Sequence, residues 1–315
     1  MSTALPALPS DLLRACHQRQ VGVHFIRITL FAVLYAAGAG GAVMAAAGVT
    51  VAWQWLLLIP LYLVAGASLH GISLFTHEAV HGTLLKNRWW NGVLGALCAM
   101  PVLQNFTAYR VLHLRHHADL GGEGDPDHYA AYTQWTWLIF TMNWLRLLIG
   151  YPIYITGIPL LGLKHGDWME RAGILVEMAL TALLVCACIL WVPPLWLLHG
   201  WLIPMVFINT MVNIRGMSQH TLLEHASDEV RGTRTILTTP LVRFFMCNEN
   251  YHLEHHLYPG VPWHHLPQMH EALRPALQQA GAPFIPTYAS FVREFLRDSI
   301  RRSPLGRVWW SKSHS

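Results

Sequence analysis

The chain has 315 residues, of which 53% are hydrophobic and only 12% carry a charge, about half the charged fraction of a soluble globular domain. This composition excludes an ordinary soluble domain and indicates a membrane protein. The net charge of +4 comes from scattered basic residues without a basic stripe, which excludes nucleic-acid binding.

The first residues and the cysteines exclude two further classes of protein. Residues 1–20 are polar and contain two prolines and two arginines, so we expect no cleavable signal peptide and assign residues 1–24 to a cytoplasmic N-terminal segment. The five cysteines form no Cys-x-x-Cys pair. We therefore expect neither a disulfide scaffold nor a cysteine-based zinc site.

The first predicted element is a helical hairpin over about residues 25–75. Residues 28–77 contain no Asp, Glu, Lys or Arg, and about 20 apolar residues suffice for one membrane span. The stretch therefore fits two spans that meet at Gly48-Val49-Thr50. Four glycines would allow close helix contacts in lipid: Gly38, Gly40, Gly41 and Gly66.

Two apolar stretches in the middle of the chain, residues 89–109 and 129–163, are harder to place. The second is interrupted by Arg146, Pro152 and Pro159. If the histidine clusters on both sides of each stretch meet in one site, each stretch crosses the membrane an even number of times or not at all. Interfacial helices or re-entrant segments buried against protein would satisfy this condition.

A second hairpin is predicted over about residues 172–214, with its turn at Pro193-Pro194, because residues 178–214 are again free of charge. All 21 Lys and Arg then lie on the side opposite the two turns, which makes that side cytoplasmic. Residues 276–315 are expected to form a cytoplasmic tail with a charged surface helix. We predict an all-α protein with about four transmembrane helices in two hairpins, interfacial helices and a cytoplasmic histidine-rich cap, with the membrane domain over residues 25–275.

The twenty histidines include three clusters with helical spacing. Residues three and four apart share a helix face, so we expect each cluster to aim all its imidazoles at one point. With one more histidine that follows Gln219 they supply nine imidazoles, too many for one ion with about four to six ligands, so we predict two metal ions. The candidate ligands are His77 and His81; His113, His116 and His117; His220; and His252, His255 and His256, with His225 as a reserve candidate.

The remaining histidines are expected to be interfacial or capping residues: His17, His24, His70, His199, His264, His265, His270 and His314. His77-Glu78-x-x-His81 also matches the motif of zinc proteases, in which the glutamate is the general base. That alternative leaves six clustered histidines unused. A metal-handling or transport protein is a third alternative, but it would require ionisable residues near the bilayer midplane, where both hairpins have none.

With these motifs the chain resembles the integral-membrane fatty acid desaturase family, which also includes hydroxylases and carotenoid ketolases. Asp125-Pro126 and the segment 248–262 are similar to signatures that follow the family's second box and surround its third, and the resemblance covers roughly residues 50–275. It implies that two irons are held by the eight clustered histidines and that His220 is the family's additional histidine. It also implies O2 as co-substrate and removal of hydrogen from an unactivated C–H bond, which yields a double bond or, after oxygen rebound, an alcohol.

Details of the resemblance limit which substrates and partners we expect. The third box begins with His rather than Gln and no His-Pro-Gly-Gly motif occurs, so no cytochrome b5 is fused, and the spacing of His77 and His81 argues against a CoA thioester. We expect an acyl chain that enters between the hairpins, in an inner or cell membrane. The alternative is hydroxylation or ketolation of a lipid, a carotenoid or a small amino-acid-derived substrate. Electrons must then come from a separate ferredoxin, rubredoxin or cytochrome b5. Candidate docking residues, which could instead hold lipid headgroups, are Lys86, Arg88, Arg231, Arg234 and Arg243; candidate acids that orient the ligands are Glu78, Asp125, Glu224 and Glu254.

Overall fold

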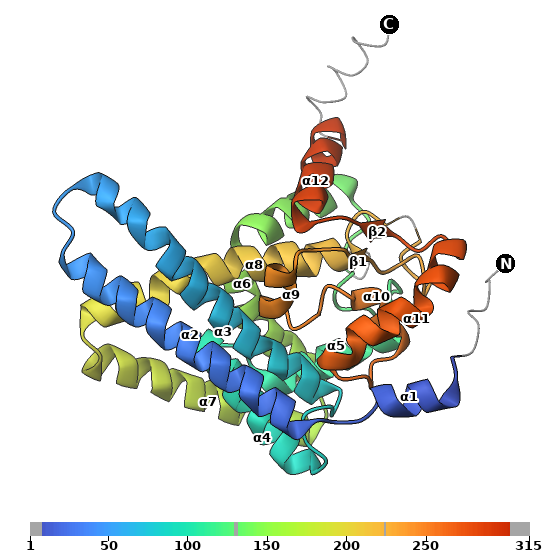
Figure 1. Ribbon diagram of the computed structural model, residues 1–315, viewed down its shortest axis with the longest axis horizontal. Helices are drawn as coiled ribbons and strands as arrows, with labels where there is room; N and C mark the ends of the chain where they lie inside the picture. Colours follow the sequence, from blue (N-terminus) through green and yellow to red (C-terminus); the bar gives the residue numbers. More distant parts are fainter. Residues whose placement is uncertain (1–7, 129–131, 224, 303–315) are drawn as a thin grey trace, which may run out of the picture.

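The computed structural model describes residues 8–128, 132–223 and 225–302, and in these ranges the chain is almost entirely helical (Figure 1). The predicted all-α fold is confirmed. The elements are α1 (Ser10–Cys16), α2 (Val21–Ala47), η1 (Ala52–Leu58), α3 (Ile59–Val80), α4 (Arg88–Ala99), η2 (Met100–Val102), α5 (Phe106–Ala118), α6 (Thr136–His165), α7 (Trp168–Trp191), η4 (Trp196–Leu202), α8 (Ile203–His220), β1 (Thr235–Ile236), α9 (Pro240–Phe245), α10 (His252–Leu257), η5 (Trp263–His265), α11 (Leu266–Gln279), β2 (Phe284–Ile285) and α12 (Tyr288–Arg302).

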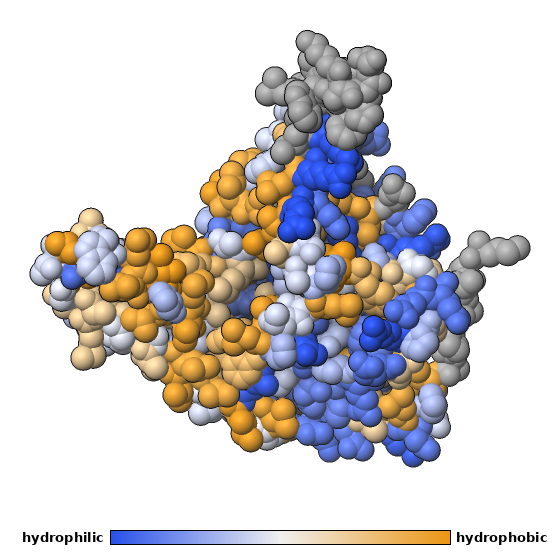
Figure 2. All heavy atoms as spheres, turned by 45° about the horizontal axis from the view of Figure 1, so that its top comes forward, coloured by the Kyte–Doolittle hydropathy of each residue, from blue (hydrophilic) through white to orange (hydrophobic). Residues whose placement is uncertain are grey.

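The outer surface of the long helices is apolar. Met44, Trp168 and Trp191 are 77%, 77% and 80% exposed, and many other large apolar side chains on these helices are also exposed. Figure 2 shows an apolar zone on the side where the α2–α3 hairpin extends and a hydrophilic zone on the side of α1 and α11. Apolar surface on this scale is expected where lipid replaces water. The division of the surface is that of a protein embedded in a membrane on one side.

Both predicted turns are confirmed, and α2 packs along α3, whereas α7 and α8 diverge from their turn (Figure 1). Helix α2 ends at Ala47 and η1 begins at Ala52, while α7 ends at Trp191 and η4 begins at Trp196, so the two turns lie where the sequence placed them. A Cβ atom on Gly38 would lie 2.9 Å from the Leu61 carbonyl oxygen, and one on Gly66 would lie 2.9 Å from the Pro204 carbonyl oxygen. These two glycines therefore let α2 approach α3 and α3 approach α8. Gly40 has nothing within 4 Å and makes no such contact.

Five helices, rather than about four, are long and apolar enough to span a membrane. The additional one is α6, which has a break in its helical backbone at Ile149. Asn209 of α8 repairs this break, since its side-chain oxygen accepts from Tyr151 N at 3.1 Å and its amide donates to Leu148 O at 2.9 Å. The five are Val21–Ala47, Ala52–Val80, Trp137–His165, Trp168–Trp191 and Trp196–His220.

Both ends of α6 lie beside elements that surround the histidine clusters. Near its start, the ring centroid of Trp144 is 5.5 Å from that of Phe295 in α12. At its end, the Arg115 guanidinium on α5 donates to the His165 carbonyl oxygen at 3.5 Å. Segments of α6 on both sides of its break thus contact elements that surround the histidine clusters, which is the arrangement that the parity condition calls for. Residues 89–109 form α4, η2 and the start of α5; α4 has 12 residues, too few to cross about 30 Å of hydrocarbon.

The cap, formed by α1, α5 and residues 225–302, covers the ends of the membrane helices. Cys16 of α1 is buried with Leu266 and Met269 of α11. Phe291 and Phe295 of α12 are buried with Met217 of α8. β1 and β2 form a short parallel ladder, with Thr235 opposite Phe284 and Ile236 opposite Ile285. Residues from both ends of the described chain therefore pack onto the same body as the histidine-bearing helices.

Candidate metal centre

Nine histidine side chains converge where four elements meet: the C-terminal end of α3, α5, the last residue of α8, and α10. They form two groups, and within each group the ring nitrogens that face inward lie within 4.8 Å of one another. All nine side chains are buried or partly buried. The five-histidine group consists of His77, His81, His113, His117 and His255, and the four-histidine group of His116, His220, His252 and His256.

The structure corrects the expectation that each sequence cluster aims at a single point. In α5, His113 and His117 join the five-histidine group, whereas His116 joins the four-histidine group. In α10 the roles are reversed, because His255 joins the first group and His252 and His256 the second. The reason is helical geometry, since side chains at i+3 and i+4 are separated by about 100° around the axis and lie on either side of residue i. Each triple cluster therefore serves both groups.

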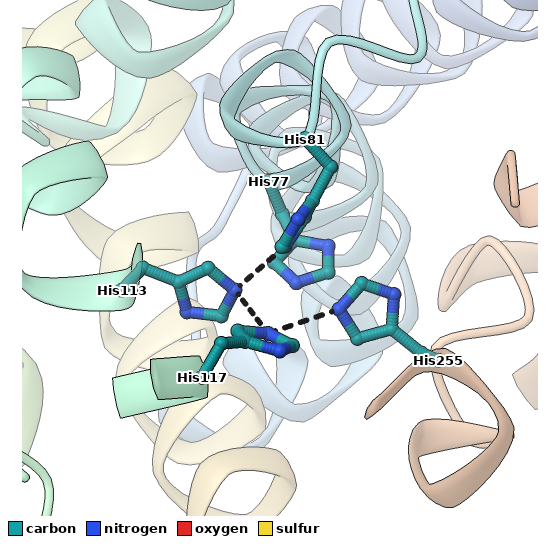
Figure 3. A group of neighbouring side chains, drawn as sticks. All are labelled: His77, His81, His113, His117 and His255. Atoms are coloured by element: carbon teal, nitrogen blue, oxygen red, sulfur yellow. Dashed lines mark hydrogen bonds between the residues drawn. The ribbon is translucent and has the colours of Figure 1, made fainter. Parts of the chain in front are cut away.

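The Nε2 atoms of the five-histidine group lie close to one another (Figure 3). His113 Nε2 lies 3.0 Å from the Nε2 atoms of both His81 and His117, and His117 Nε2 lies 3.3 Å from that of His255. The His77 ring is 4.4 Å from the His255 ring, measured between centroids. Figure 3 shows the five rings approaching from three directions: α3, α5 and α10. They enclose one common centre.

The four-histidine group lies next to the first. His220 Nε2 is 3.3 Å from His116 Nε2 and 3.2 Å from His252 Nε2, and His252 Nε2 is 3.0 Å from His256 Nε2. The rings of His117 and His256 stack between the groups with centroids 4.2 Å apart and an interplanar angle of 14°. The two groups thus share a wall of two imidazoles, as adjacent sites for two ions would.

Acceptors outside the groups fix the orientation of several rings. His116 Nδ1 lies 2.9 Å from Asp125 Oδ1, His220 Nδ1 lies 3.0 Å from the Gly232 carbonyl oxygen, and His77 Nδ1 lies 2.8 Å from Glu249 Oε1. Carbonyl and ionised carboxylate oxygens only accept, so Nδ1 carries the proton in His116 and His220. His77 Nδ1 lies at ion-pair distance from Glu249 without hydrogen-bond geometry. In a neutral imidazole the Nε2 lone pair then points into the group, which is the arrangement found around bound metal ions.

These orientations test whether the residues fit a metal. His116 and His220 both donate from Nδ1, so two Nε2 lone pairs face each other at 3.3 Å. Between two neutral rings this is repulsive, and either a metal ion between them or a proton on His116 Nε2 relieves the repulsion. Two nitrogens bound to one ion at about 2.1 Å, with an angle of about 90–110° between them, would lie about 3.0–3.4 Å apart. Six neighbouring Nε2 pairs in the two groups are 3.0–3.3 Å apart, and all inward nitrogens of a group lie within 4.8 Å, so the donor set fits metal ions.

The ionisation of the clustered rings agrees with this fit. Burial lowers the pKa of most of them below the ordinary value, and it lowers that of His252 to about 4 although the neighbouring Glu249 acts in the opposite direction. His116 is the exception, since burial would lower its pKa but the hydrogen bond to Asp125 raises it. Neutral imidazole is the form that binds metals. The rings with a lowered pKa outside the membrane spans are His81, His113, His117, His252, His255 and His256.

Asp125 is the predicted acid that contacts a clustered ring. Its side chain is 2% exposed, and the backbone amides of Gly121 and Asp127 donate to it at 2.8 and 2.9 Å. Burial alone would raise the pKa of Asp125, but the hydrogen bond with His116 and these amides lower it. The carboxylate therefore stays ionised and keeps the proton on His116 Nδ1.

Glu249 is the acid that sequence reasoning missed. It is 1% exposed and bridges both groups, with Oε1 2.8 Å from His77 Nδ1 and Oε2 3.7 Å from His252 Nδ1. Arg215 Nη1 donates to Oε2 at 3.3 Å. Burial would raise the pKa of Glu249, but His77 and His252 lower it well below the usual value. The available signal was its position three residues before His252.

The other predicted acids have different partners. Glu78 Oε2 accepts from Thr83 Oγ1 at 2.6 Å and from Trp263 N at 3.2 Å. Glu254 lies 2.5 Å from His270 Nδ1 and accepts from Thr235 Oγ1 at 2.6 Å. Glu78 thus links α3 to the cap and Glu254 links segments within the cap. Among the described residues neither is hydrogen-bonded to a ring of the two groups, although Glu78 lies in a further group with His77 and Glu249 whose potential ligand atoms are within 4.8 Å of one another. Glu224 lies outside the described residues.

The histidines outside the clusters belong to neither group, but His24, His70, His199 and His270 are buried rather than interfacial. His225 is exposed and belongs to neither group. His24 Nδ1 accepts from Trp263 Nε1 at 3.1 Å, His199 Nδ1 is 2.6 Å from Tyr62 Oη, and His17 Nδ1 donates to Leu13 O at 2.7 Å. His70, His264, His265 and His270 are likewise absent from the two groups, and His314 lies outside the described residues.

Two interpretations are corrected by these contacts. The zinc-protease alternative needs Glu78 as a base at an ion with few ligands, but its carboxylate is bonded elsewhere and His77 lies in a group of five imidazoles. The proposed electron-donor surface also changes. Arg234 is 4% exposed and donates to the carbonyl oxygens of Ser218 and Thr221 at the end of α8, so it cannot contact a partner.

The chain is similar in sequence to a known protein family and to several of its members. The fatty acid desaturase profile matches residues 53–288. The chain is 29% identical to a dihydrorhizobitoxine desaturase of Bradyrhizobium elkanii over 74% of this chain and 71% of that protein. It is 26% identical to a sphingolipid delta(4)-desaturase of Xenopus tropicalis, covering 81% of this chain and 76% of the relative. It is 24% identical to an sn-1 acyl-lipid omega-3 desaturase (ferredoxin) of a Synechocystis strain, covering 86% and 79%.

The family match covers most of the chain and contains all nine converging histidines. The five long apolar helices provide the membrane part that such proteins need. The resemblance drawn from the histidine boxes is therefore confirmed, and this chain belongs to the fatty acid desaturase family as an integral membrane oxidoreductase whose histidine clusters fit the family's metal site.

Proposed function

We propose that the protein is a diiron oxidoreductase that uses O2 and externally supplied electrons to desaturate an acyl chain. One observation carries the proposal: nine imidazoles form two adjacent groups, and the groups share a wall formed by His117 and His256. The proposed ligands are the five histidines of the first group and the four of the second. When bound, two irons would supply the O2-dependent abstraction of hydrogen from an unactivated C–H bond.

The chain's own residues hold and orient this site. Asp125 keeps a proton on His116 Nδ1, and Glu249 lies where it would do the same for His77 Nδ1. The Gly232 carbonyl oxygen accepts from His220 Nδ1. Because these acceptors are fixed by the fold, the Nε2 lone pairs are directed inward before any ion binds. Burial of the site keeps bulk water away from the reacting carbon.

The electrons are proposed to come from a separate carrier on the cytoplasmic side. The name of the Synechocystis relative includes ferredoxin, which supports a carrier of that class. The lysines and arginines of the chain lie away from the two hairpin turns. By the positive-inside rule this distribution supports a metal site on the cytoplasmic side of an inner or cell membrane. Turnover with reduced nicotinamide alone, in the absence of carrier and reductase, would contradict this part of the proposal.

Lipid analysis of expressing cells tests the reaction. Mass spectrometry of total lipids would compare the wild type with His116→Ala, a change in the four-histidine group that leaves the membrane helices intact. A product two hydrogens lighter than its precursor in wild-type cells alone is the expected result. A product heavier by one oxygen would assign hydroxylation or ketolation instead. Identical lipids in both strains, with iron-loaded wild-type protein present, would contradict the proposal.

A further inference from the structure

A cavity of about 400 Å³ opens beside the five-histidine group, outside the contact between the hairpins. At Gly66, on the expected path between the hairpins, α3 and α8 are in close contact. The cavity lies instead among the end of α3, the loop that follows it, α4 and the start of α5. Its lining includes His81, so it reaches a histidine of the group. Its volume is in the range of small-molecule sites.

All the charged residues that line the cavity are basic. Arg19, Lys86, Arg88 and Arg110 line it, and no Asp or Glu does. Arg110 is paired with Glu170 at 2.9 Å. Within residues 8–128, 132–223 and 225–302, the other three cations have no ion-pair partner, and all three are exposed. Three unneutralised cations around one concave site favour an anion there.

The inner part of the same cavity is apolar. Val80, Leu85 and Phe106 line it together with His81, whose Nε2 faces His113. The cavity thus offers cations at one part of its wall and a hydrocarbon surface beside the histidine group. A molecule with an anionic head and an apolar chain matches both properties, whereas a folded protein carrier would not enter a space of this size.

The wall of the cavity is held in place by internal hydrogen bonds. Asn91 of α4 donates to the Ala79 carbonyl oxygen at 2.7 Å and accepts from Leu85 N at 3.1 Å. The chain leaves α3 through Gly82, whose φ of 70° is the left-handed conformation that glycine adopts readily. The cationic loop is therefore fixed relative to the histidine group, which limits the loss of conformational freedom on binding.

The cavity lies beside two exposed tryptophans of α4. Trp89 and Trp90, directly after Arg88, are 65% and 56% exposed. Exposed tryptophans next to cations are typical of the boundary between headgroups and hydrocarbon. A lipid could thus reach the cavity from the membrane, and a free amphiphile could reach it from water.

We infer that this cavity is the substrate entrance and that it selects substrates with an anionic head group, a carboxylate or a phosphate, held by Arg19, Lys86 and Arg88 while the apolar chain extends toward His81. The inference rests on the proposed function, because it names the substrate class of the same site. The oxygens of the anion accept hydrogen bonds from the guanidinium and ammonium groups.

A binding assay tests this without turnover, so its result stands even if the protein does not desaturate. The purified full chain in neutral detergent binds tritiated stearate, which is competed with unlabelled stearate, stearyl alcohol, phosphatidic acid or phosphatidylcholine. The test variant is Lys86→Ala/Arg88→Ala. The matched control is Arg293→Ala/Arg297→Ala, which removes the same charge from exposed positions on α12, on the opposite side of the molecule from α4 in Figure 1.

We expect stearate to compete better than stearyl alcohol and the test variant to weaken stearate binding about tenfold, with the control unchanged. Binding of the alcohol should stay unchanged in both variants. Competition by phosphatidic acid would identify a membrane lipid as the source, and competition by stearate alone would identify a free acid. Equal binding of acid and alcohol would overturn the inference. So would a test variant that binds stearate normally and loses only its reduction by a ferredoxin, because the cations would then serve the electron donor.

Discussion

Replacing Glu249 by Gln should weaken iron binding more than any other change outside the nine histidines. The substitution keeps the shape of the side chain but removes the charge that faces His77 Nδ1 at 2.8 Å and His252 Nδ1 at 3.7 Å. Loss of such an outer carboxylate typically lowers metal affinity about 10- to 100-fold, or about 1.4–2.8 kcal/mol. Because Glu249 touches rings of both groups, we expect both ions to be affected.

The same change should also destabilise the metal-free protein. Arg215 Nη1 is 3.3 Å from Glu249 Oε2, and its side chain is 15% exposed. Removing one partner of a buried ion pair costs about 3–5 kcal/mol, and the remaining exposure of the arginine places the expected cost near the lower end, about 3 kcal/mol. A melting curve of the metal-free variant would measure this part separately.

Glu254→Gln is the matched control. Glu254 is 0% exposed and lies on the same segment, but its carboxylate contacts His270 and Thr235. It should lower stability and leave iron affinity unchanged. The assay is elemental analysis of both variants after dialysis against a series of buffered Fe²⁺ concentrations. Equal iron loss in the two variants, or full iron retention in Glu249→Gln, would refute the assigned role of Glu249.

Three further predictions concern ligands, metal and helix contacts. His116→Ala should abolish product formation, whereas His265→Ala should retain most of it; equally inactive, folded variants would show that the C-terminal histidines were misjudged. Removing metal with a chelator should lower the melting temperature, since an ion present at about 1,000 times its Kd adds about 4 kcal/mol, and added Fe²⁺ should restore it; an unchanged melting curve would argue against metal binding. Gly66→Leu should cost about 1–3 kcal/mol or more, because its side chain would meet the Pro204 carbonyl oxygen, while Gly40→Leu, with nothing within 4 Å, should melt like the wild type.

Much of the fold could be predicted because it depends on local composition. The uncharged runs 28–77 and 178–214 define the hairpins, since a membrane span needs only length and hydropathy. The break in α6 at Ile149 could not be predicted from the sequence, because the hydrogen bonds that stabilise it come from Asn209 on another helix. A contact of that kind leaves no periodic signal in either segment.

The candidate site could likewise be predicted only in part. The nine histidines are evident from their spacing, but the distribution of each triple cluster over two groups depends on how α5 and α10 face each other. Glu249 escaped notice because its partner His77 is far away in sequence. The basic residue Arg234 looked like a surface charge, yet it is buried at the end of α8, where its guanidinium meets two free carbonyl oxygens.

The interleaving of ligands from α5 and α10 has a consequence for how the protein acquires iron. Each of these helices supplies side chains to both groups, with His116 and His117 as neighbours that serve different ions. Whatever motion α5 and α10 keep in the metal-free protein is therefore restrained by the first ion and not again by the second. Filling of the first position should thus favour filling of the second, and a titration with Fe²⁺ should approach a single steep step. The half-filled protein would then be a scarce species, and if the ions are the proposed irons, a lone reduced iron would rarely meet O2.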